Sequence, residues 1–364
     1  MNLPVCSLCG KIYPAKGTPY RCECGGVYDY LDFPAYRGDQ IDSSESGLWK
    51  YHSSFGLGDD LPKVSLGEGN TPLVMAQFGS QPVWLKLEYL NPTGSYKDRG
   101  SAVLTGFLVS RGVTSAVEDS SGNAGASFAA YAARAGIKAR IFIPASASGP
   151  KRTQIEAYGA AVELIPGARA EAARAVSLAA EQGQTYASHA YMPFGLNGIA
   201  TIAYEITEQM GGRAPGTVVA PLGHGGLLYG LILGFSALRK AAVVKQEPFY
   251  VGVQASGCAP VFNAFKNHEI TLREPVESDT IAEGVKVTVP IRGSTILKRI
   301  SERRGNILEI DDQHLKKAYF QIAEKGFYIE PTSALVWAVL HEIIGKVPEP
   351  IVLILTGSGL KTQL

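Results

Sequence analysis

Charge is scarce in this sequence, and no long apolar run occurs. Charged residues make up 18% of the 364 positions and the formal net charge is +1, so no strong field exists to attract nucleic acid or an acidic membrane surface. No apolar run reaches the ~18 residues needed to span a bilayer. The first residues, M-N-L-P-V-C-S-L-C-G, lack the basic start and apolar centre of a signal peptide. We therefore expect a cytoplasmic protein that binds neither nucleic acid nor membrane.

Two common nucleotide-binding motifs are also absent. No G-x-x-x-x-G-K-[ST] loop occurs, and the glycines from Gly223 to Gly230 are spaced G-x-G-G-x-x-x-G instead of G-x-G-x-x-G. No low-complexity tract and no solenoid-length repeat is present. The glycine turns of this chain suit a single phosphate better than a dinucleotide.

Cysteine is rare beyond residue 24. Four of the five cysteines, Cys6, Cys9, Cys22 and Cys24, have the spacing C-x2-C-x12-C-x-C. In a cytosolic chain this crowding favours a metal site over disulfides, and two facing pairs supply the ligands of tetrahedral zinc. The second pair is tighter than the usual C-x2-C, so reduced thiols without metal are the alternative. Cys258 is expected to be a small buried residue.

Short β-like runs alternate with Ala-rich helical stretches from residue 64 onward. We expect T-Y-A-S-H-A to form a strand and T-S-A-L-V-W-A-V-L-H-E-I-I-G to form one helix. This alternation predicts an α/β fold with a parallel sheet and helices on both faces. We divide the chain into a head (1–30), a connecting arm (31–64) and a main region (65–364). Within the main region a smaller α/β subdomain, about 100–200, is expected to be inserted in a larger one.

Ligands of such sheets bind beyond the carboxyl ends of the strands, where glycine-rich turns lead into helices. Glycine lets backbone N–H groups approach an anion, and a helix N-terminus adds favourable partial charge. Four turns of this kind are Asn91–Gly100 (N-P-T-G-S-Y-K-D-R-G), Ser120–Gly125 (S-S-G-N-A-G), Pro221–Leu227 (P-L-G-H-G-G-L) and Thr356–Lys361 (T-G-S-G-L-K).

These turns and three further motifs resemble the fold type II pyridoxal-phosphate enzymes, and most closely their threonine synthase branch. The similarity runs in order from about Cys6 to Lys361. The additional motifs are L-G-E-G-N-T-P-L from Leu66, A-Y-E-I from Ala203 and E-P-T-S-A from Glu330. The resemblance implies a tryptophan synthase β-like fold of two doubly wound sheet domains with a small zinc-ribbon-like head. It also implies pyridoxal 5'-phosphate as cofactor, a small-molecule amino-acid substrate and a homodimer.

Lys97 is the residue that the resemblance assigns to the covalent bond with the cofactor, as a Schiff base. Desolvation lowers the pKa of a lysine and makes its amine a usable nucleophile and base. The alternative is that Lys97 merely begins an exposed helix, with Ser95 as its N-cap. Asp98 and Glu330 are predicted to be structural, the first as a helix-start charge and the second as a helix cap.

The resemblance also assigns the binding loops. The pyridine nitrogen is expected to meet Thr356 or, as second choice, Ser358. A hydroxyl there does not hold the nitrogen protonated as an aspartate would, which suits elimination and replacement over transamination. The cofactor phosphate is expected on the backbone of Gly223, His224, Gly225, Gly226 and Leu227. Asn123 is expected beside the cofactor ring oxygen, and the substrate carboxylate on Ser120, Ser121, Gly122, Asn123 and Ala124. An ordinary strand-to-helix turn and a helix-capping turn are the alternatives for these two loops.

One stretch departs from the threonine synthase pattern. Those enzymes usually carry N-P-[YF]-R-x-x-G-Q-K-T before the A-[YF]-E-I helix, and its polar side chains help to hold the phosphate of O-phosphohomoserine. Here residues 192–201 read M-P-F-G-L-N-G-I-A-T, so Gly195 stands at the arginine position and Ile199 and Ala200 replace the Gln-Lys pair. A dianionic phosphate prefers Arg or Lys. Lys151, Arg152 or Arg292 would have to supply that charge.

Three functions follow from the sequence. The leading one is a pyridoxal-phosphate-dependent lyase of threonine synthase type, which converts O-phosphohomoserine to threonine. The alternative on the same scaffold is a serine/threonine ammonia-lyase or a β-replacement synthase for a non-phosphorylated or serine-derived amino acid. A non-catalytic regulatory protein with a partner-binding zinc head is the third, and the retention of Lys97, Asn123 and the glycine loop argues against it.

Overall fold

The computed structural model describes residues 3–147, 149–274, 277–303 and 305–362. The chain forms two compact units: unit 1 is Met1–Asn70 with Asn91–Ile199, and unit 2 is Thr71–Leu90 with Ala200–Leu364. Helix α5, Gly195–Gln209, begins in unit 1 and continues into unit 2. Among the described residues, no helix is long and apolar enough to cross a bilayer.

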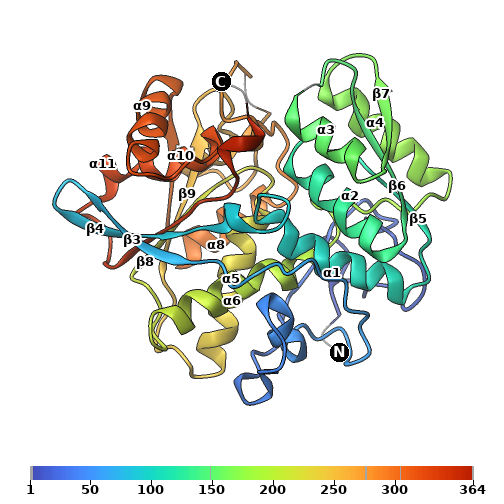
Figure 1. Cartoon of the computed structure of the whole chain (residues 1–364), viewed down its shortest axis with the longest axis horizontal. Helices are drawn as coiled ribbons and strands as arrows, with labels where there is room; N and C mark the ends of the chain where they lie inside the picture. The colour runs from blue at the N-terminus through green and yellow to red at the C-terminus, as the bar shows by residue number, and fades with distance from the viewer. Residues whose placement is uncertain (1–2, 148, 275–276, 304, 363–364) are drawn as a thin grey trace. The chain divides into compact units, whose positions relative to one another are not determined.

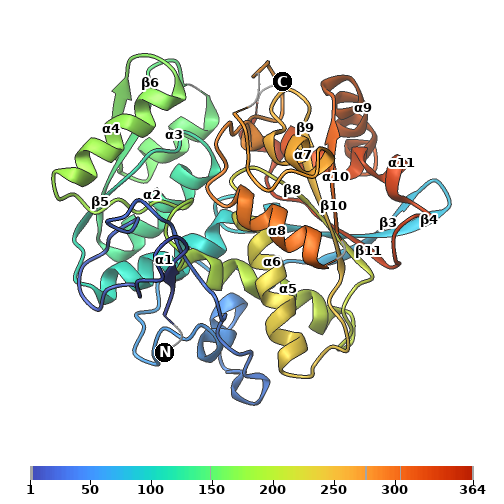
Figure 2. The ribbon, with the colours of Figure 1, turned by 180° about the vertical axis from the view of Figure 1, so that it is seen from behind.

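Unit 2 is built on a six-stranded sheet in the order β10-β9-β8-β11-β4-β3 (Figures 1 and 2). β3 and β4 form an antiparallel pair, and the strands from β4 to β10 are mutually parallel. The strands are β3 Leu73–Phe78, β4 Gln81–Lys86, β8 Thr217–Pro221, β9 Phe249–Ala255, β10 Gly305–Ile310 and β11 Ile351–Ile354.

The two central strands are almost entirely apolar, with Thr217 as the one polar residue of β8 and β11. Every residue of β8 (T-V-V-A-P) and β11 (I-V-L-I) is buried, as expected for parallel strands covered on both faces. Helices α9 and α10 lie over one face in Figure 1, and α8 lies over the other in Figure 2. The helices of unit 2 are α6 Gly226–Lys240, α7 Pro260–Lys266, α8 Gly293–Arg303, α9 Asp312–Ala323, α10 Pro331–Ala338 and α11 Leu340–Ile343.

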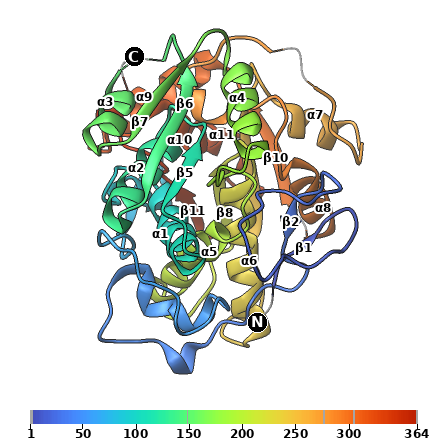
Figure 3. The same ribbon diagram turned by 90° about the vertical axis from the view of Figure 1, so that its right-hand side faces the viewer.

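Unit 1 contains a smaller parallel sheet in the order β5-β6-β7. Helices α2 and α4 both contact β6 and lie on opposite sides of the three strands (Figure 3). The strands are β5 Ser115–Glu118, β6 Lys138–Pro144 and β7 Ala161–Ile165, and the helices are α1 Lys97–Ser110, α2 Asn123–Ala135, α3 Pro150–Ala157 and α4 Arg169–Glu181.

The N-terminal part of unit 1 has little regular structure. Its strands β1, Val5–Cys6, and β2, Tyr28–Asp29, form a short antiparallel pair. An aromatic cluster attaches this part to the rest of the unit, because the ring of Tyr13 packs edge-on against Phe194 with centroids 4.8 Å apart. Short 3-10 helices cover Gly38–Gln40, Gly47–Ser54, Glu88–Leu90, Glu283–Val285 and Gly359–Lys361 of the chain.

The α/β fold expected from the sequence is confirmed, with two local corrections. T-Y-A-S-H-A does not form a strand: only Tyr186 pairs with β5, in a single parallel bridge to Val117. The helix expected from Thr332 onward is divided at Val339, where one residue separates α10 from α11.

Candidate active site

A buried carboxylate stabilises the lysine turn, which is the segment Asn91–Gly100. Asp98 lies in the first turn of α1 and is completely buried. It accepts hydrogen bonds from the Thr93 backbone N–H at 2.7 Å, from the Thr93 hydroxyl at 2.5 Å and from the Ser127 hydroxyl of α2 at 2.7 Å. These contacts fix the turn before Lys97 and join the beginning of α1 to α2. The structural role expected for Asp98 therefore agrees with its contacts.

Lys97 is the first residue of α1 and is half-buried, with its ammonium 5.0 Å from the centre of the Tyr96 ring. The N-cap position belongs to Tyr96, and no side chain caps the helix. Ser95 is completely buried, and its hydroxyl has no hydrogen-bond partner among the described residues. The alternative of a simple Ser95-capped exposed helix is therefore wrong.

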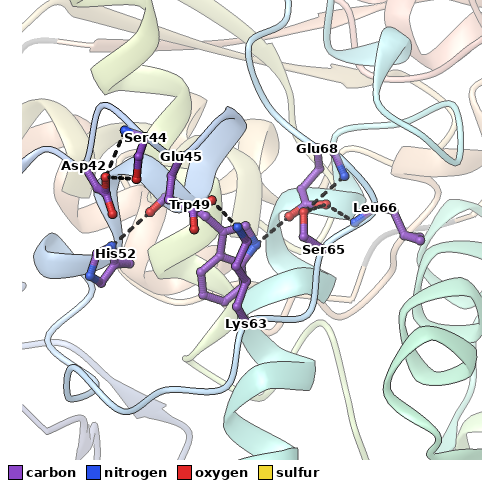
Figure 4. A network of polar contacts seen from close by, with 10 residues as sticks. Asp42, Ser44, Glu45, Trp49, His52, Lys63, Ser65, Leu66 and Glu68 are labelled. Atoms are coloured by element: carbon purple, nitrogen blue, oxygen red, sulfur yellow. Dashed lines mark hydrogen bonds and ion pairs between the residues drawn. The ribbon is translucent and has the colours of Figure 1, made fainter.

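A second buried carboxylate organises the loop that precedes this turn. Glu68, in the 66–73 motif, accepts from the Trp49 indole at 2.8 Å and from the Leu66 N–H at 2.9 Å (Figure 4). It also accepts from the Tyr131 hydroxyl at 2.7 Å. The adjacent Gly69 N–H donates to the side chain of Asn91 at 3.0 Å. The 66–70 loop is therefore fixed to the first residue of the lysine turn.

The Ser120–Ala124 segment forms the turn between β5 and α2. Gly122 is the N-cap residue and has no side chain, so the first N–H groups of α2 are not capped from that position. The Ser120 hydroxyl accepts from the Gly122 N–H at 3.2 Å. A Cβ at Gly125 would lie 1.8 Å from the Ser120 carbonyl oxygen, so only glycine permits this tight turn. The loop presents backbone donors at a helix N-terminus, as an anion site requires.

The Gly223–Leu227 segment connects β8 to the 15-residue helix α6. Gly225 has φ +93°, which favours glycine. A Cβ at Gly226 would meet nothing within 4 Å, so space is open beside the first turn of α6. The His224 carbonyl accepts from the N–H of Arg292, a residue that is 2% exposed.

The hydroxyls that follow β11 differ in their surroundings. The Thr356 hydroxyl oxygen lies 2.8 Å from that of Ser333 and donates to Glu330 at 3.3 Å. The Ser358 hydroxyl accepts from the Leu360 N–H at 3.2 Å and so caps a 3-10 turn. Glu330 stands at the N-cap of α10, but its side chain makes no capping bond there. The expectation of Glu330 as a cap is therefore corrected: it accepts from Thr356 instead.

The 192–199 part of the divergent stretch is tightly packed within unit 1. A Cβ at Gly195 would lie 3.3 Å from the Gly100 carbonyl oxygen, and one at Gly198 only 1.8 Å from that of Arg99. The side chain of Asn197 accepts from the Tyr30 hydroxyl at 2.8 Å. The beginnings of α1 and α5 thus approach closely because glycine stands at these positions.

The four N-terminal thiols form one cluster. The sulfur atoms of Cys6, Cys9, Cys22 and Cys24 all lie within 4.8 Å of one another. Cys6 and Cys22 are buried, while Cys9 and Cys24 are exposed. Burial alone would raise the pKa of the Cys6 thiol, but the N–H groups of Cys9 and Leu8 and the neighbouring thiols lower it to about 6. Cys258 is completely buried, as expected.

Each unit carries groups that fit pyridoxal phosphate. Unit 1 contains a half-buried lysine amine and the Ser120–Ala124 loop, and unit 2 contains the Gly223–Leu227 loop and the Thr356 hydroxyl. The open space beside Gly226 accommodates an anion on the N–H groups of α6. The sequence did not reveal Glu118 and His189, which adjoin the Ser120 loop, because no motif marks them.

Comparisons with known proteins agree with this assignment of class. The chain belongs to the pyridoxal-phosphate dependent enzyme family, whose model matches residues 64–357. It is a fold type II, pyridoxal-phosphate-dependent lyase, so the expectations of family, fold and cofactor are confirmed.

Its curated relatives include threonine synthases. The chain is 32% identical to the threonine synthase of Methanocaldococcus jannaschii, over 98% of this chain and 92% of that protein. It is 34% identical to the threonine synthase of a Bacillus species, over 86% of this chain and 90% of that one. Among solved structures, a T.th. threonine deaminase has a TM-score of 0.67 at 26% identity, with 81% of this chain and 94% of that chain covered. Maize serine racemase, at 20% identity, has a TM-score of 0.71 over 81% of this chain and 89% of that chain, and shows the fold alone.

Proposed function

We propose that this protein is a threonine synthase, which converts O-phosphohomoserine and water to threonine and phosphate. The observation that carries the proposal is the 32% identity to a threonine synthase over 98% of the chain. The threonine synthase similarity thus includes the head, the lysine turn and the glycine loops.

We assign the cofactor contacts as follows. Lys97 would bind the cofactor covalently, and the N–H groups of Gly223–Leu227 would bind its phosphate. Asn123 would hold its ring oxygen, and the Thr356 hydroxyl, with Ser358 as second choice, would hold its pyridine nitrogen. When bound, the cofactor withdraws electrons from the substrate and acidifies its Cα–H.

The protein groups then have three tasks. The N–H groups and hydroxyls of the Ser120–Ala124 loop bind the substrate carboxylate. The Lys97 amine removes the protons from Cα and Cβ and returns protons to Cγ and Cα. The C–O bond at Cγ breaks with its electron pair on the leaving phosphate, and water supplies the hydroxyl at Cβ. The second proton of that water goes to the leaving phosphate, so the net reaction is substrate plus water giving threonine plus phosphate.

A second candidate is a serine or threonine ammonia-lyase. The specific observation in its favour is the divergent stretch, in which Gly195, Ile199 and Ala200 carry no charge. A neutral wall suits the short uncharged side chain of serine or threonine better than a dianionic phosphate. In this case the products are a ketoacid and ammonia.

A substrate panel distinguishes the two candidates. Purified holoprotein is incubated with O-phosphohomoserine, serine, threonine and O-acetylserine, and phosphate, ammonia and ketoacid are measured. Threonine and phosphate formed in equal amounts support the first candidate. Ketoacid and ammonia from serine or threonine, with no phosphate release, support the second. The visible absorbance of the bound cofactor should be lost in Lys97→Ala, and a colourless wild-type protein after incubation with cofactor would contradict both.

We also propose that the four thiols bind one zinc ion. Their mutual distances of at most 4.8 Å and their two-pair spacing support tetrahedral ligation. Elemental analysis of the purified protein should give about one zinc per chain. For the whole protein we propose a homodimer, which analytical ultracentrifugation of the holoprotein tests; a monomer at every concentration would overturn that assignment.

A further inference from the structure

Within unit 1, a buried glutamate and a histidine form a pair beside the Ser120–Ala124 loop. Glu118 is the last residue of β5 and is completely buried. Its Oε2 accepts from the Ser120 backbone N–H at 2.5 Å, and its Oε1 lies 2.5 Å from Nδ1 of His189. One proton, carried by either the carboxyl or the imidazole, forms this hydrogen bond. Glu118 therefore links the first residue of the loop to a distant histidine.

The chain brings His189 to this place through an irregular segment that comes after α4 and runs beside β5. The Val117 N–H donates to the Thr185 carbonyl at 2.8 Å, and the Ala187 N–H donates to the Val117 carbonyl at 2.9 Å. His189 lies two residues further on, so its ring reaches the carboxyl end of β5. The same segment continues into the divergent 192–201 stretch.

The contacts of this cluster favour a positioning role over metal binding. The Glu118, Asp119 and His189 ligand atoms lie within 4.8 Å of one another, a spacing that a metal could use. Both oxygens of Glu118 are already engaged by the protein, however, and Asp119 accepts from the Tyr186 hydroxyl at 2.7 Å. A metal would have to displace these hydrogen bonds, one of which shapes the loop itself.

We propose that Glu118 and His189 are positioning residues that hold the Ser120–Asn123 backbone in the conformation that binds the substrate carboxylate. The inference rests on the function proposed above, which assigns the substrate carboxylate to this loop. Neither side chain touches the reacting atoms: Glu118 acts through the Ser120 N–H, and His189 acts through Glu118. The Gly122 N–H donates to the Ser120 hydroxyl, so its position also depends on how the Ser120 backbone is held.

The pair also sets the charge beside the loop. Burial raises the pKa of Glu118 to about 7, against the opposing effects of the Ser120 N–H and of the charges on Lys97 and Arg169. Burial and the Glu118 charge together raise the pKa of Asp119 as well. While the proton of the Glu118–His189 hydrogen bond and the second imidazole proton are both retained, the pair is neutral. Its deprotonation places a negative charge next to the site of an anionic carboxylate, which weakens binding.

The first test is kinetic. Glu118→Ala and His189→Ala are expected to raise the KM for the amino-acid substrate by at least about tenfold, with kcat changed less than about threefold. Glu118→Gln can accept from Ser120 through its amide oxygen and donate to His189 through its amide nitrogen, so it should restore most of the loss. The wild-type KM should rise as the pH rises through about 7, and the KM of Glu118→Gln should not.

Tyr186→Phe, which removes a neighbouring contact without touching the loop, is the matched control. An unchanged KM in both alanine variants, or a Glu118→Gln variant as impaired as Glu118→Ala, would overturn the proposal.

The second test does not depend on turnover. Amide hydrogen exchange of the purified protein should show faster exchange at Ser120 and Gly122 in Glu118→Ala and His189→Ala, and wild-type exchange in Glu118→Gln. If the substrate panel gives no product, this measurement still decides the positioning role, so failure of the proposed function and failure of this inference are distinguished. Unaltered exchange at Ser120 in both alanine variants would refute it. His189→Ala serves as the principal variant where Glu118→Ala does not fold.

Discussion

Glu118 should make the stability of this protein fall as the pH rises. The carboxyl is completely buried, and burial raises its pKa from 4.5 to about 7. A group whose pKa is raised on folding stabilises the folded protein fully below its unfolded pKa, and this contribution is lost as the pH rises through the folded pKa. The loss should therefore occur between about pH 4.5 and about pH 7.

The magnitude follows from the two pKa values. Their difference of about 2.5 corresponds to about 3 kcal/mol of unfolding free energy, since one pKa unit is ~1.36 kcal/mol. Glutamine at position 118 keeps the shape and hydrogen bonds of the side chain but cannot ionise. We expect Glu118→Gln to match the wild type near pH 4.5 and to exceed its stability by about 3 kcal/mol at about pH 8.

Urea unfolding of the holoprotein, followed by circular dichroism from about pH 4.5 to about pH 8, measures this difference. Other titrating groups, Asp119 among them, are present in both proteins and largely cancel in the comparison. Glu163→Gln, at an exposed carboxylate of β7, is the control and should give a nearly constant difference. If the difference between Glu118→Gln and the wild type is also constant across this range, the reasoning from burial is refuted.

Three further predictions concern other parts of the chain. Lys86 is completely buried and donates to Glu205 at 2.7 Å, so Lys86→Met should cost about 3–5 kcal/mol in urea unfolding; adding Glu205→Leu should recover most of that loss, and a double variant no more stable than the single one would contradict the pairing. Gly125→Ala places a Cβ 1.8 Å from the Ser120 carbonyl oxygen and should lower amino-acid affinity, read from the cofactor absorbance, by at least about tenfold; wild-type affinity would show that the loop tolerates the side chain. Chelation of zinc, or Cys9→Ser, should lower the melting temperature of the holoprotein together with its zinc content, whereas an unchanged melting temperature on loss of zinc would contradict a stabilising site.

The parts of the fold with strong periodicity could be predicted from the sequence. The apolar runs of β8 and β11 and the regular helix α6 appear where their patterns indicate them. The T-Y-A-S-H-A run was misassigned because its β-like composition does not determine pairing. Only Tyr186 bridges to β5, and the chain then turns so that His189 meets Glu118. Tertiary contact overrode local propensity at this point.

In the candidate site, too, some features can be predicted from the sequence and others depend on tertiary contacts. The glycine-rich turns can be recognised in the sequence because glycine is concentrated in them. Glu118 and His189 lie in no motif, and the motif that contains Glu68 does not single it out; the importance of all three comes from burial and from partners far along the chain. Ser95 illustrates the opposite error: its type suggests a helix cap, but the helix begins one residue later and leaves the hydroxyl buried without a partner among the described residues.

The divergent stretch connects packing with substrate choice. A Cβ at Gly195 would lie 3.3 Å from the Gly100 carbonyl oxygen, and one at Gly198 would lie 1.8 Å from that of Arg99. Gly198 corresponds to the glycine of the threonine synthase pattern, but Gly195 stands where that pattern has arginine, so a side chain at 195 would start against the backbone of the helix that carries Lys97. A simple Gly195→Arg reversion should therefore disturb the lysine helix as well as add charge. For phosphohomoserine to be the substrate, its phosphate must meet a cation from another element, and phosphate release in the substrate panel decides whether one does.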